Sequence, residues 1–160
     1  MKRLAISMAV MGLLSACGSG DQTPAAPAVP PPPPLTDAQR ATMLAALPAP
    51  FAQADLENGG AVFARCRSCH TIVPGAANMT GPNLYGVIGR VAGTHEGFNY
   101  SPALKAAGFT WDGDKVEHWL ENPRTFLPGN KMTFPGLPDE TDRRDVVAFL
   151  SVEGAVRPAP

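Results

Sequence analysis

Cys66-Arg67-Ser68-Cys69-His70 is the stretch of sequence that decides the fold of this chain. Its pattern, C-x-x-C-H, is typical of c-type haem attachment. Both thiols lie on one short turn, so both can form thioether bonds to the vinyl groups on one side of a porphyrin. The histidine follows directly, which puts its imidazole under the iron as an axial ligand. The pattern predicts one haem c, bound covalently through Cys66 and Cys69 and ligated by His70.

Cysteine pairs also occur in disulfides, zinc half-sites and thioredoxin-type redox motifs. Structural zinc takes about four ligands, usually as two such pairs. This chain has only 3 cysteines, and Cys17 lies far from the motif. His95 and His118 are not in a paired ligand spacing, and the alternating strand and helix pattern around a thioredoxin motif is absent. Haem attachment is therefore favoured, with a non-haem metal-binding module as an alternative.

The N-terminus has the layout of a secretory signal, with positive charge in Met1 to Arg3 and an apolar run from Leu4 to Ala16. The run is shorter than the roughly 20 residues that span a bilayer. It ends in Leu14-Ser15-Ala16-Cys17, which resembles the lipobox of bacterial lipoproteins. We expect residues 1–16 to be a lipoprotein signal peptide and Cys17 to be lipidated, which anchors the chain on the periplasmic side of a bacterial membrane. An ordinary signal peptide with an incidental Cys17 is the alternative.

Residues 17–54 are predicted to be a tether rich in proline and alanine, with five consecutive prolines at Pro30 to Pro34. Such a segment favours extended polyproline II and cannot form a packed core. Fully extended, it would reach on the order of 100 Å. A short helix can interrupt it, because Thr36 and Gln39 fit a capping box and Pro48 ends the run.

Residues 55–160 are long enough for one small domain. The chain has a formal net charge of −1, and no basic footprint for nucleic acid is visible. Two helical patterns begin after Asp55 and Asp112, which can act as N-caps, and a third has Asp139, Glu140 and Asp142 at its N-terminus, where negative charge suits the helix dipole. Strand signals are sparse, so we expect an all-α domain. Its loops, such as 71–83 and 123–136, are too long for a compact fold unless they wrap around a large apolar cofactor.

The second axial ligand of the iron determines the function. By chemistry alone, Met79 and Met132 are the suitable candidates, and His95 and His118 are rivals. Met132 follows a turn, Pro128-Gly129-Asn130-Lys131. The domain closely resembles the class I cytochromes c, the small electron carriers of mitochondria and bacteria. The resemblance covers residues 55–152 and is carried by Cys66 to Thr71, Gly81-Pro82-Asn83-Leu84-Tyr85-Gly86, Gly89-Arg90, Gly97-Phe98-Asn99-Tyr100, Trp111, Trp119 to Pro123, Pro128 to Met132 and the closing helix.

The resemblance implies a class I cytochrome c fold with Met132 as the sixth ligand, opposite His70. It also implies that the carbonyl of Pro82 accepts a hydrogen bond from His70, which orients the ring and raises its basicity. Arg90, Tyr100 and Trp111 match positions that hydrogen-bond or neutralise a buried haem propionate. Gly59 matches a glycine at the crossing of the first and last helices. Tyr85 and Leu104 depart from residues often seen in the family.

Histidine and methionine ligation raises the reduction potential and suits electron transfer. We therefore expect a monomeric one-electron carrier rather than an enzyme. By resemblance, its partners are a quinol-oxidising bc-type complex and a terminal haem–copper oxidase. The predicted docking surface consists of four cations around the haem edge, Arg65, Arg67, Arg124 and Lys131. The alternative is a haem domain with a displaceable sixth ligand, acting as a peroxidase or as a gas or redox sensor.

Overall fold

The computed structural model describes residues 32–157; the predicted signal peptide, Cys17 and the first part of the predicted tether lie outside the described residues. The described chain is all-α, as predicted, and contains one isolated antiparallel bridge between Val91 and Thr110. Its elements are, in order, α1 (Asp37–Ala45), η1 (Phe51–Gln53), α2 (Leu56–Phe63), α3 (Pro102–Lys105), α4 (Gly113–Glu121), α5 (Pro123–Phe126) and α6 (Glu140–Glu153). No helix among residues 32–157 is long and apolar enough to cross a membrane.

Helices α2 and α4 begin directly after their predicted N-cap residues, and α6 begins directly after Asp139. The side chains of Asp55, Asp112 and Asp139 accept hydrogen bonds from backbone N–H groups in the first turns of α2, α4 and α6. A carboxylate at this position satisfies donors that have no partner inside the helix. The capping box of Thr36 and Gln39 is also present at the start of α1. Sequence analysis missed α3 and α5, which are only one turn long and begin with proline.

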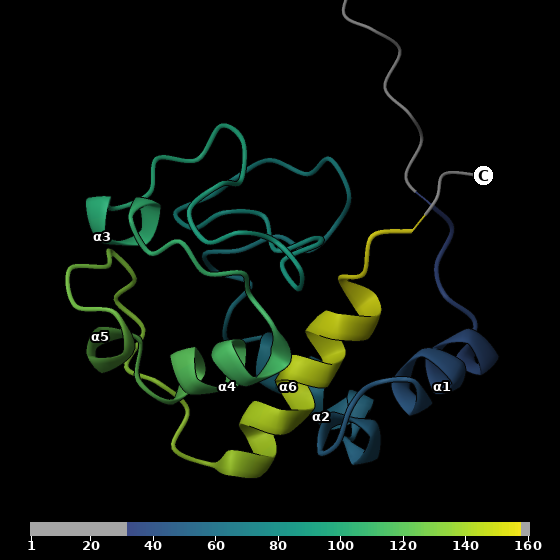
Figure 1. Cartoon of the computed structure of the whole chain (residues 1–160). Coiled ribbons are helices and arrows are strands. Elements are labelled where there is room, and N and C mark those ends of the chain that lie inside the picture. The colour runs from purple at the N-terminus through teal and green to yellow at the C-terminus, as the bar shows by residue number, and fades with distance from the viewer. Residues whose placement is uncertain (1–31, 158–160) are drawn as a thin grey trace, which may run out of the picture.

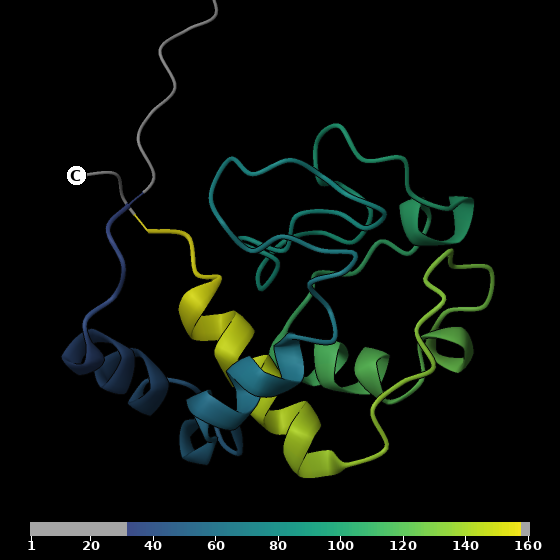
Figure 2. The same ribbon diagram turned by 180° about the vertical axis from the view of Figure 1, so that it is seen from behind.

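The helices other than α3 form one layer, and α3 and the long loops form a second layer above it (Figures 1 and 2). In the first layer, α6 packs against α2, α4 and α1. The second layer comes mainly from the chain between α2 and α3, and it includes the predicted long loop 71–83. Buried Arg143 links α6 to α4 and to the segment before α6. Its guanidinium binds Glu117 of α4 at 2.5 Å and donates to the carbonyl of Leu137 at 2.8 Å.

Helices α2 and α6 cross in direct backbone contact at Gly59. A Cβ atom at this position would lie 2.2 Å from the carbonyl oxygen of Asp145 and 2.9 Å from Cβ of Phe149. No larger residue can occupy the crossing without separating the helices. Asp145 also links α6 to the start of α2. Its carboxylate accepts hydrogen bonds from Asn58 Nδ2 at 2.9 Å and from the N–H of Asp55 at 3.1 Å.

The segment before α2 also packs on the helices. Leu35, Phe51 and Ala54 are buried, and Leu44 and Leu47 pack against the core. Residues of the predicted tether therefore contribute apolar surface to the interior, although proline-rich composition suggested an extended spacer. The capping box and the leucines were the only signals in the sequence for this packing.

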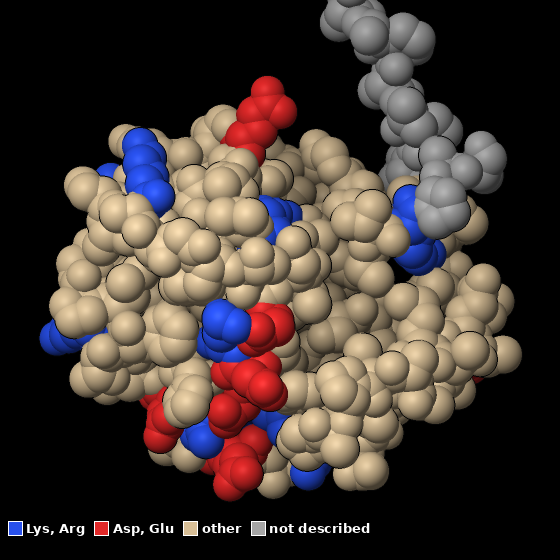
Figure 3. All heavy atoms as spheres, viewed as in Figure 1, with Lys and Arg blue, Asp and Glu red and all other residues tan. Residues whose placement is uncertain are grey.

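Acidic side chains gather on one face of the molecule, over α4 and the start of α6 (Figure 3). Asp114 lies in the first turn of α4, and Glu140 and Asp142 lie in the first turn of α6. At these positions the negative charges interact favourably with the helix dipoles.

Gly59→Ala is expected to lower the free energy of unfolding by about 3 kcal/mol, because the added Cβ overlaps the α6 backbone. Gly60→Ala is the matched control in the same helix. Its Cβ would meet only the ring of Phe149, at 3.2 Å, and alanine favours a helix interior by about 1 kcal/mol over glycine. Denaturant unfolding of the two variants checks this difference. Equal destabilisation by both substitutions would contradict the close crossing.

Candidate functional site

A cavity of about 440 Å³ lies between the helix layer and the loop layer. This volume is in the range of pockets that bind small molecules and cofactors. Apolar side chains from both layers form its walls, among them Phe63, Val87, Leu104, Val116, Leu120, Val146 and Leu150. The cavity is also lined by every residue that sequence analysis assigned to haem binding: Cys66, Cys69, His70, Pro82, Arg90, Tyr100, Trp111 and Met132.

The cysteines are positioned by the turn that follows α2. The N–H groups of Cys69 and His70 both donate to the carbonyl of Cys66, at 3.0 and 2.9 Å. This turn directs both thiols to the cavity wall, where neither forms a disulfide. Burial raises the pKa of the Cys66 thiol, an effect that the nearby Arg65 opposes.

His70 is held from one side of its ring. Its Nδ1 atom lies 2.8 Å from the carbonyl oxygen of Pro82, and the tautomer that donates this hydrogen bond leaves Nε2 free to bind a metal. The backbone at Gly81 packs directly on the ring, because a Cβ there would lie 2.3 Å from Cε1 of His70. Burial lowers the pKa of His70, which favours the neutral imidazole that metals require.

Met132 is positioned by the side chain of Asn130. The Nδ2 atom of Asn130 donates to the carbonyls of Pro123 at 2.7 Å and Leu127 at 2.8 Å, while its Oδ1 accepts from the N–H of Met132 at 2.8 Å. One amide therefore ties the methionine loop to α5 and fixes the start of the segment that brings Met132 to the cavity. The turn was visible in the sequence, but the role of the asparagine was not.

Arg90 brings a positive charge to the cavity wall. Its guanidinium donates to the carbonyl of Asn83 at 3.0 Å and to that of Tyr85. No carboxylate among residues 32–157 forms an ion pair with Arg90. A guanidinium without an acidic partner, beside the largely buried Tyr100 and Trp111, suits an anionic group of a bound cofactor. These donors therefore fit the propionate of a haem.

Buried Asn83 organises the loop that carries Pro82 and Arg90. Its Nδ2 atom donates to the carbonyls of Val73 at 2.8 Å and Ala76 at 2.9 Å, and its Oδ1 accepts from the N–H of Tyr85 at 2.8 Å. This structural role was not predicted. The signal in the sequence was the Gly81-Pro82-Asn83 segment, where an asparagine follows a turn-forming pair.

The alternative ligands do not line the cavity. Met79 is 48% exposed, His118 is exposed on α4, and His95 lies half-buried in the loop layer. No group of three or more His, Cys, Asp or Glu side chains within the described residues could hold a metal ion. The described part of the chain therefore does not support the zinc alternative.

The four cations of the predicted docking surface differ in their settings. Arg65 and Lys131 line the cavity, whereas Arg67 lies over the ring of Phe63, 5.7 Å from its centroid. Arg124 is exposed on α5. Arg65 also lies 5.7 Å from the ring centroid of Phe134. Two of the four cations thus border the cavity directly.

Comparison with known proteins gives several similar chains, although no family model matches. The chain is 45% identical to cytochrome c of Stellaria longipes over 101 residues, which are 62% of this chain and 94% of that protein. It is 50% identical to cytochrome c2 of Rhodoblastus acidophilus over 97 residues, or 61% and 91% of the two chains. The solved structure of cytochrome cH from Methylobacterium extorquens matches with a TM-score of 0.57 and 40% identity, over 61% of this chain and 97% of that one.

Asn130→Ala is expected to loosen the Met132 loop, because three hydrogen bonds are lost. At about 0.7 kcal/mol for each bond, or about 2 kcal/mol in total, amide hydrogen exchange at Met132 should accelerate by roughly 30-fold. Asn99→Ala is the control, since Asn99 is exposed and contributes only its backbone carbonyl to the lysine side chain next to Met132. The same exchange rate in both variants would show that the asparagine amide does not position the loop.

Proposed function

Because this chain belongs to the class I cytochrome c family, we propose that it is a one-electron carrier tethered to a bacterial membrane and docking with its redox partners at the exposed edge of one haem c. The observation that carries the proposal is the convergence of Cys66, Cys69, His70 and Met132 on one apolar cavity. Sequence comparison supports a c-type electron carrier; the ligand set, the anchor and the partners are the parts that we propose.

In this proposal the residues around the cavity hold the haem in distinct ways. Cys66 and Cys69 would form the thioether bonds, and His70 and Met132 would ligate the iron. Arg90, Tyr100 and Trp111 would bind the propionate. When bound, the haem supplies an iron that changes between the ferrous and ferric states by one electron.

The protein's task is to keep the iron environment unchanged during this cycle. His70 is locked by the hydrogen bond to Pro82 and by contact with Gly81. The segment carrying Met132 is tied to α5 through Asn130. Because His70 and Met132 would both ligate the iron, small oxidants would find no vacant position on it. This arrangement favours electron transfer over peroxidase or sensor chemistry.

Arg65, Arg67, Arg124 and Lys131 are proposed to steer the domain to acidic surfaces on its partners. The lining of the cavity by Arg65 and Lys131 supports this, because a partner that binds these side chains approaches the cofactor closely. The acidic residues at the start of α4 and α6 lie on other elements. By resemblance, the donor is a quinol-oxidising bc-type complex and the acceptor is a haem–copper oxidase.

The anchor is proposed to be a lipid on Cys17, exposed to the periplasm. The support is the lipobox-like Leu14-Ser15-Ala16-Cys17 after a charged and apolar leader. Stable attachment needs more than one acyl chain, which a lipoprotein modification provides. The intact mass of protein extracted from membranes is the direct measurement, since it should show diacylglycerol on Cys17 and no residues before it.

Met132→Ala is expected to open the sixth position of the iron. Carbon monoxide should then change the visible spectrum of the reduced variant, and the reduction potential should fall because the thioether is lost. Met79→Ala is the control and should behave as the wild type, since Met79 is exposed and does not line the cavity. Carbon monoxide binding by the reduced wild type under native conditions would favour the sensor or peroxidase alternative instead.

Neutralising Arg124 and Lys131 together is expected to slow electron transfer to the membrane oxidase at low salt and to reduce its dependence on ionic strength. Neutralising Lys115, which lies on α4 and does not line the cavity, is the control and should have little effect. Rates measured between about 10 and 200 mM salt give the comparison. An unchanged salt dependence in the first variant would remove the docking surface from the proposal.

A further inference from the structure

The segment from Pro32 to Ala54, here called the N-terminal arm, lies against the folded domain. Leu35 is only 7% exposed and Phe51 only 4% exposed. The ring of Phe51 packs on the start of α4 so closely that a Cβ at Gly113 would lie 2.6 Å from it. Buried apolar side chains therefore hold the arm near both of its ends.

An ion pair fixes the middle of the arm to α6. Arg40 of α1 binds Glu153 at the end of α6, with Nε 2.5 Å from Oε1, and its Nη1 also lies 3.1 Å from Asp37. Helix α1 contacts both α6 and η1. The arm thus crosses the last helix as a folded element with both polar and apolar contacts.

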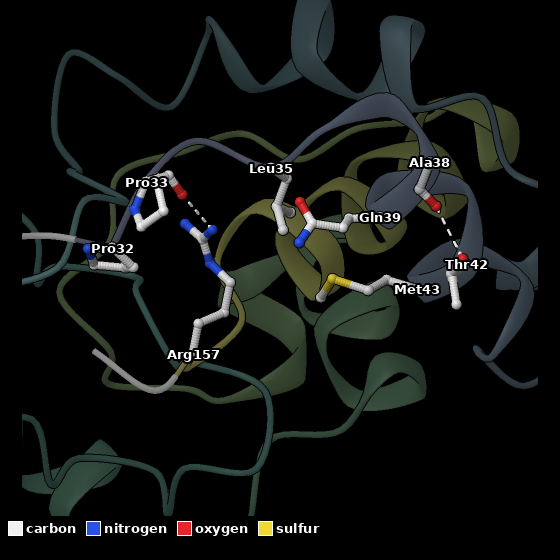
Figure 4. A pocket seen from close by; sticks show the side chains of 8 residues that line it. All are labelled: Pro32, Pro33, Leu35, Ala38, Gln39, Thr42, Met43 and Arg157. Atoms are coloured by element: carbon white, nitrogen blue, oxygen red, sulfur yellow. Dashed lines mark hydrogen bonds between the residues drawn. The ribbon is translucent and has the colours of Figure 1, made fainter. Parts of the chain in front are cut away.

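The C-terminal tail fastens the point where the arm begins. The Nη1 atom of Arg157 donates to the carbonyl of Pro33 at 2.6 Å, and the N–H of Arg157 donates to the hydroxyl of Tyr85 at 2.9 Å. Figure 4 shows Arg157 reaching across to Pro33, with Leu35 and Met43 turned toward the same hollow. Tyr85, whose presence the family resemblance left unexplained, thereby links the loop layer to this tail.

The arm and two of the proposed docking cations, Arg124 and Lys131, lie far apart on the molecule. Helices α1 and α5 stand at opposite sides in both Figure 1 and Figure 2, and the chain reaches α1 from the side that also holds the C-terminal tail. Arg124 belongs to α5, and Lys131 follows it in the methionine loop. A membrane anchor attached through the arm would therefore pull on the side of the domain opposite α5.

We propose that the N-terminal arm is a rigid mount, which fixes where the membrane tether leaves the domain and leaves only the residues before it to act as a spacer. This inference rests on the proposed lipid anchor at Cys17. The arm shortens the spacer from residues 18–54 to residues 18–31 and holds its exit point away from α5. The anchored domain then stays near the membrane with Arg124 and Lys131 uncovered.

The length of the spacer sets how concentrated the domain is at its membrane partners. With the arm bound, 31 − 18 + 1 = 14 residues separate it from Cys17. If the arm were released as far as Pro50, the spacer would grow to 50 − 18 + 1 = 33 residues. A lipid-anchored domain moves freely in the membrane plane, so its concentration at the membrane falls as the reach of the spacer grows; because reach scales with the square root of length, release should lower this concentration about 1.5-fold.

The test compares the full-length, haem-loaded wild type with Leu35→Asp/Arg40→Glu in membranes. This pair removes a buried apolar contact and reverses the charge that faces Glu153, while Phe51 stays in place. We expect at least tenfold faster amide hydrogen exchange in α1 and about 1.5-fold slower electron transfer to the membrane oxidase. Oxidation by soluble ferricyanide should be unchanged, because the cavity is not touched.

Ala41→Glu/Ala45→Glu is the matched control, since it adds negative charge to exposed positions of α1 and leaves Leu35 and the Arg40–Glu153 ion pair in place. It should keep both the exchange rates and the membrane electron transfer of the wild type. The mount is refuted if wild-type α1 exchanges as fast as an unfolded peptide. It is also refuted if the released variant transfers electrons in membranes at the wild-type rate.

A separate variant distinguishes failure of the anchor from failure of the mount. Cys17→Ala is expected to leave the membrane fraction while its α1 amides remain protected. Retention of Cys17→Ala in the membrane would refute the lipid anchor of the proposed function. The exchange rates of α1 would still decide whether the arm is bound to α6.

Discussion

The contact between α2 and α6 at Gly59 is the constraint on which the remaining structure depends. It sets the direction in which α2 ends, and the turn of Cys66 to His70 follows within a few residues. Because the backbones touch, a small sideways movement of α2 would be transmitted directly to the thiols and to the imidazole. Asp145 adds hydrogen bonds across the same crossing, so these bonds and the close backbone packing favour the same arrangement of α2 and α6.

The functional cavity depends on loops that have little regular structure of their own. Three asparagine and arginine side chains compensate for this, since Asn83, Arg90 and Asn130 satisfy backbone carbonyls that no helix or strand would pair. A buried unpaired carbonyl costs about as much as a lost hydrogen bond, so these side chains decide which loop conformation is stable. The bonds of Asn83 fix the loop whose Pro82 carbonyl binds His70, and the bonds of Asn130 fix the segment that carries Met132.

The N-terminal arm changes how the tether of this carrier is understood. Proline-rich composition predicted a spacer up to residue 54, yet residues 35–54 bury apolar side chains on α6 and α4. When the arm is bound, fewer residues separate the domain from the proposed anchor, and the chain leaves the domain at a fixed point. In the proposed anchored form, membrane attachment and electron transfer would be connected through these packing contacts rather than through the haem site.

The sequence by itself determined the haem motif, the all-α class and the starts of α2, α4 and α6, because these depend on local spacing and on capping residues. It also pointed to Met132 through a family resemblance. Only the tertiary structure decided that Met132, and not Met79 or a second histidine, lines the cavity, and that Asn130 and Asn83 hold the loops. The tertiary structure also decided that the N-terminal arm packs on α6 and α4. These features depend on contacts between residues distant in the chain, such as Arg40 with Glu153, which no local pattern encodes.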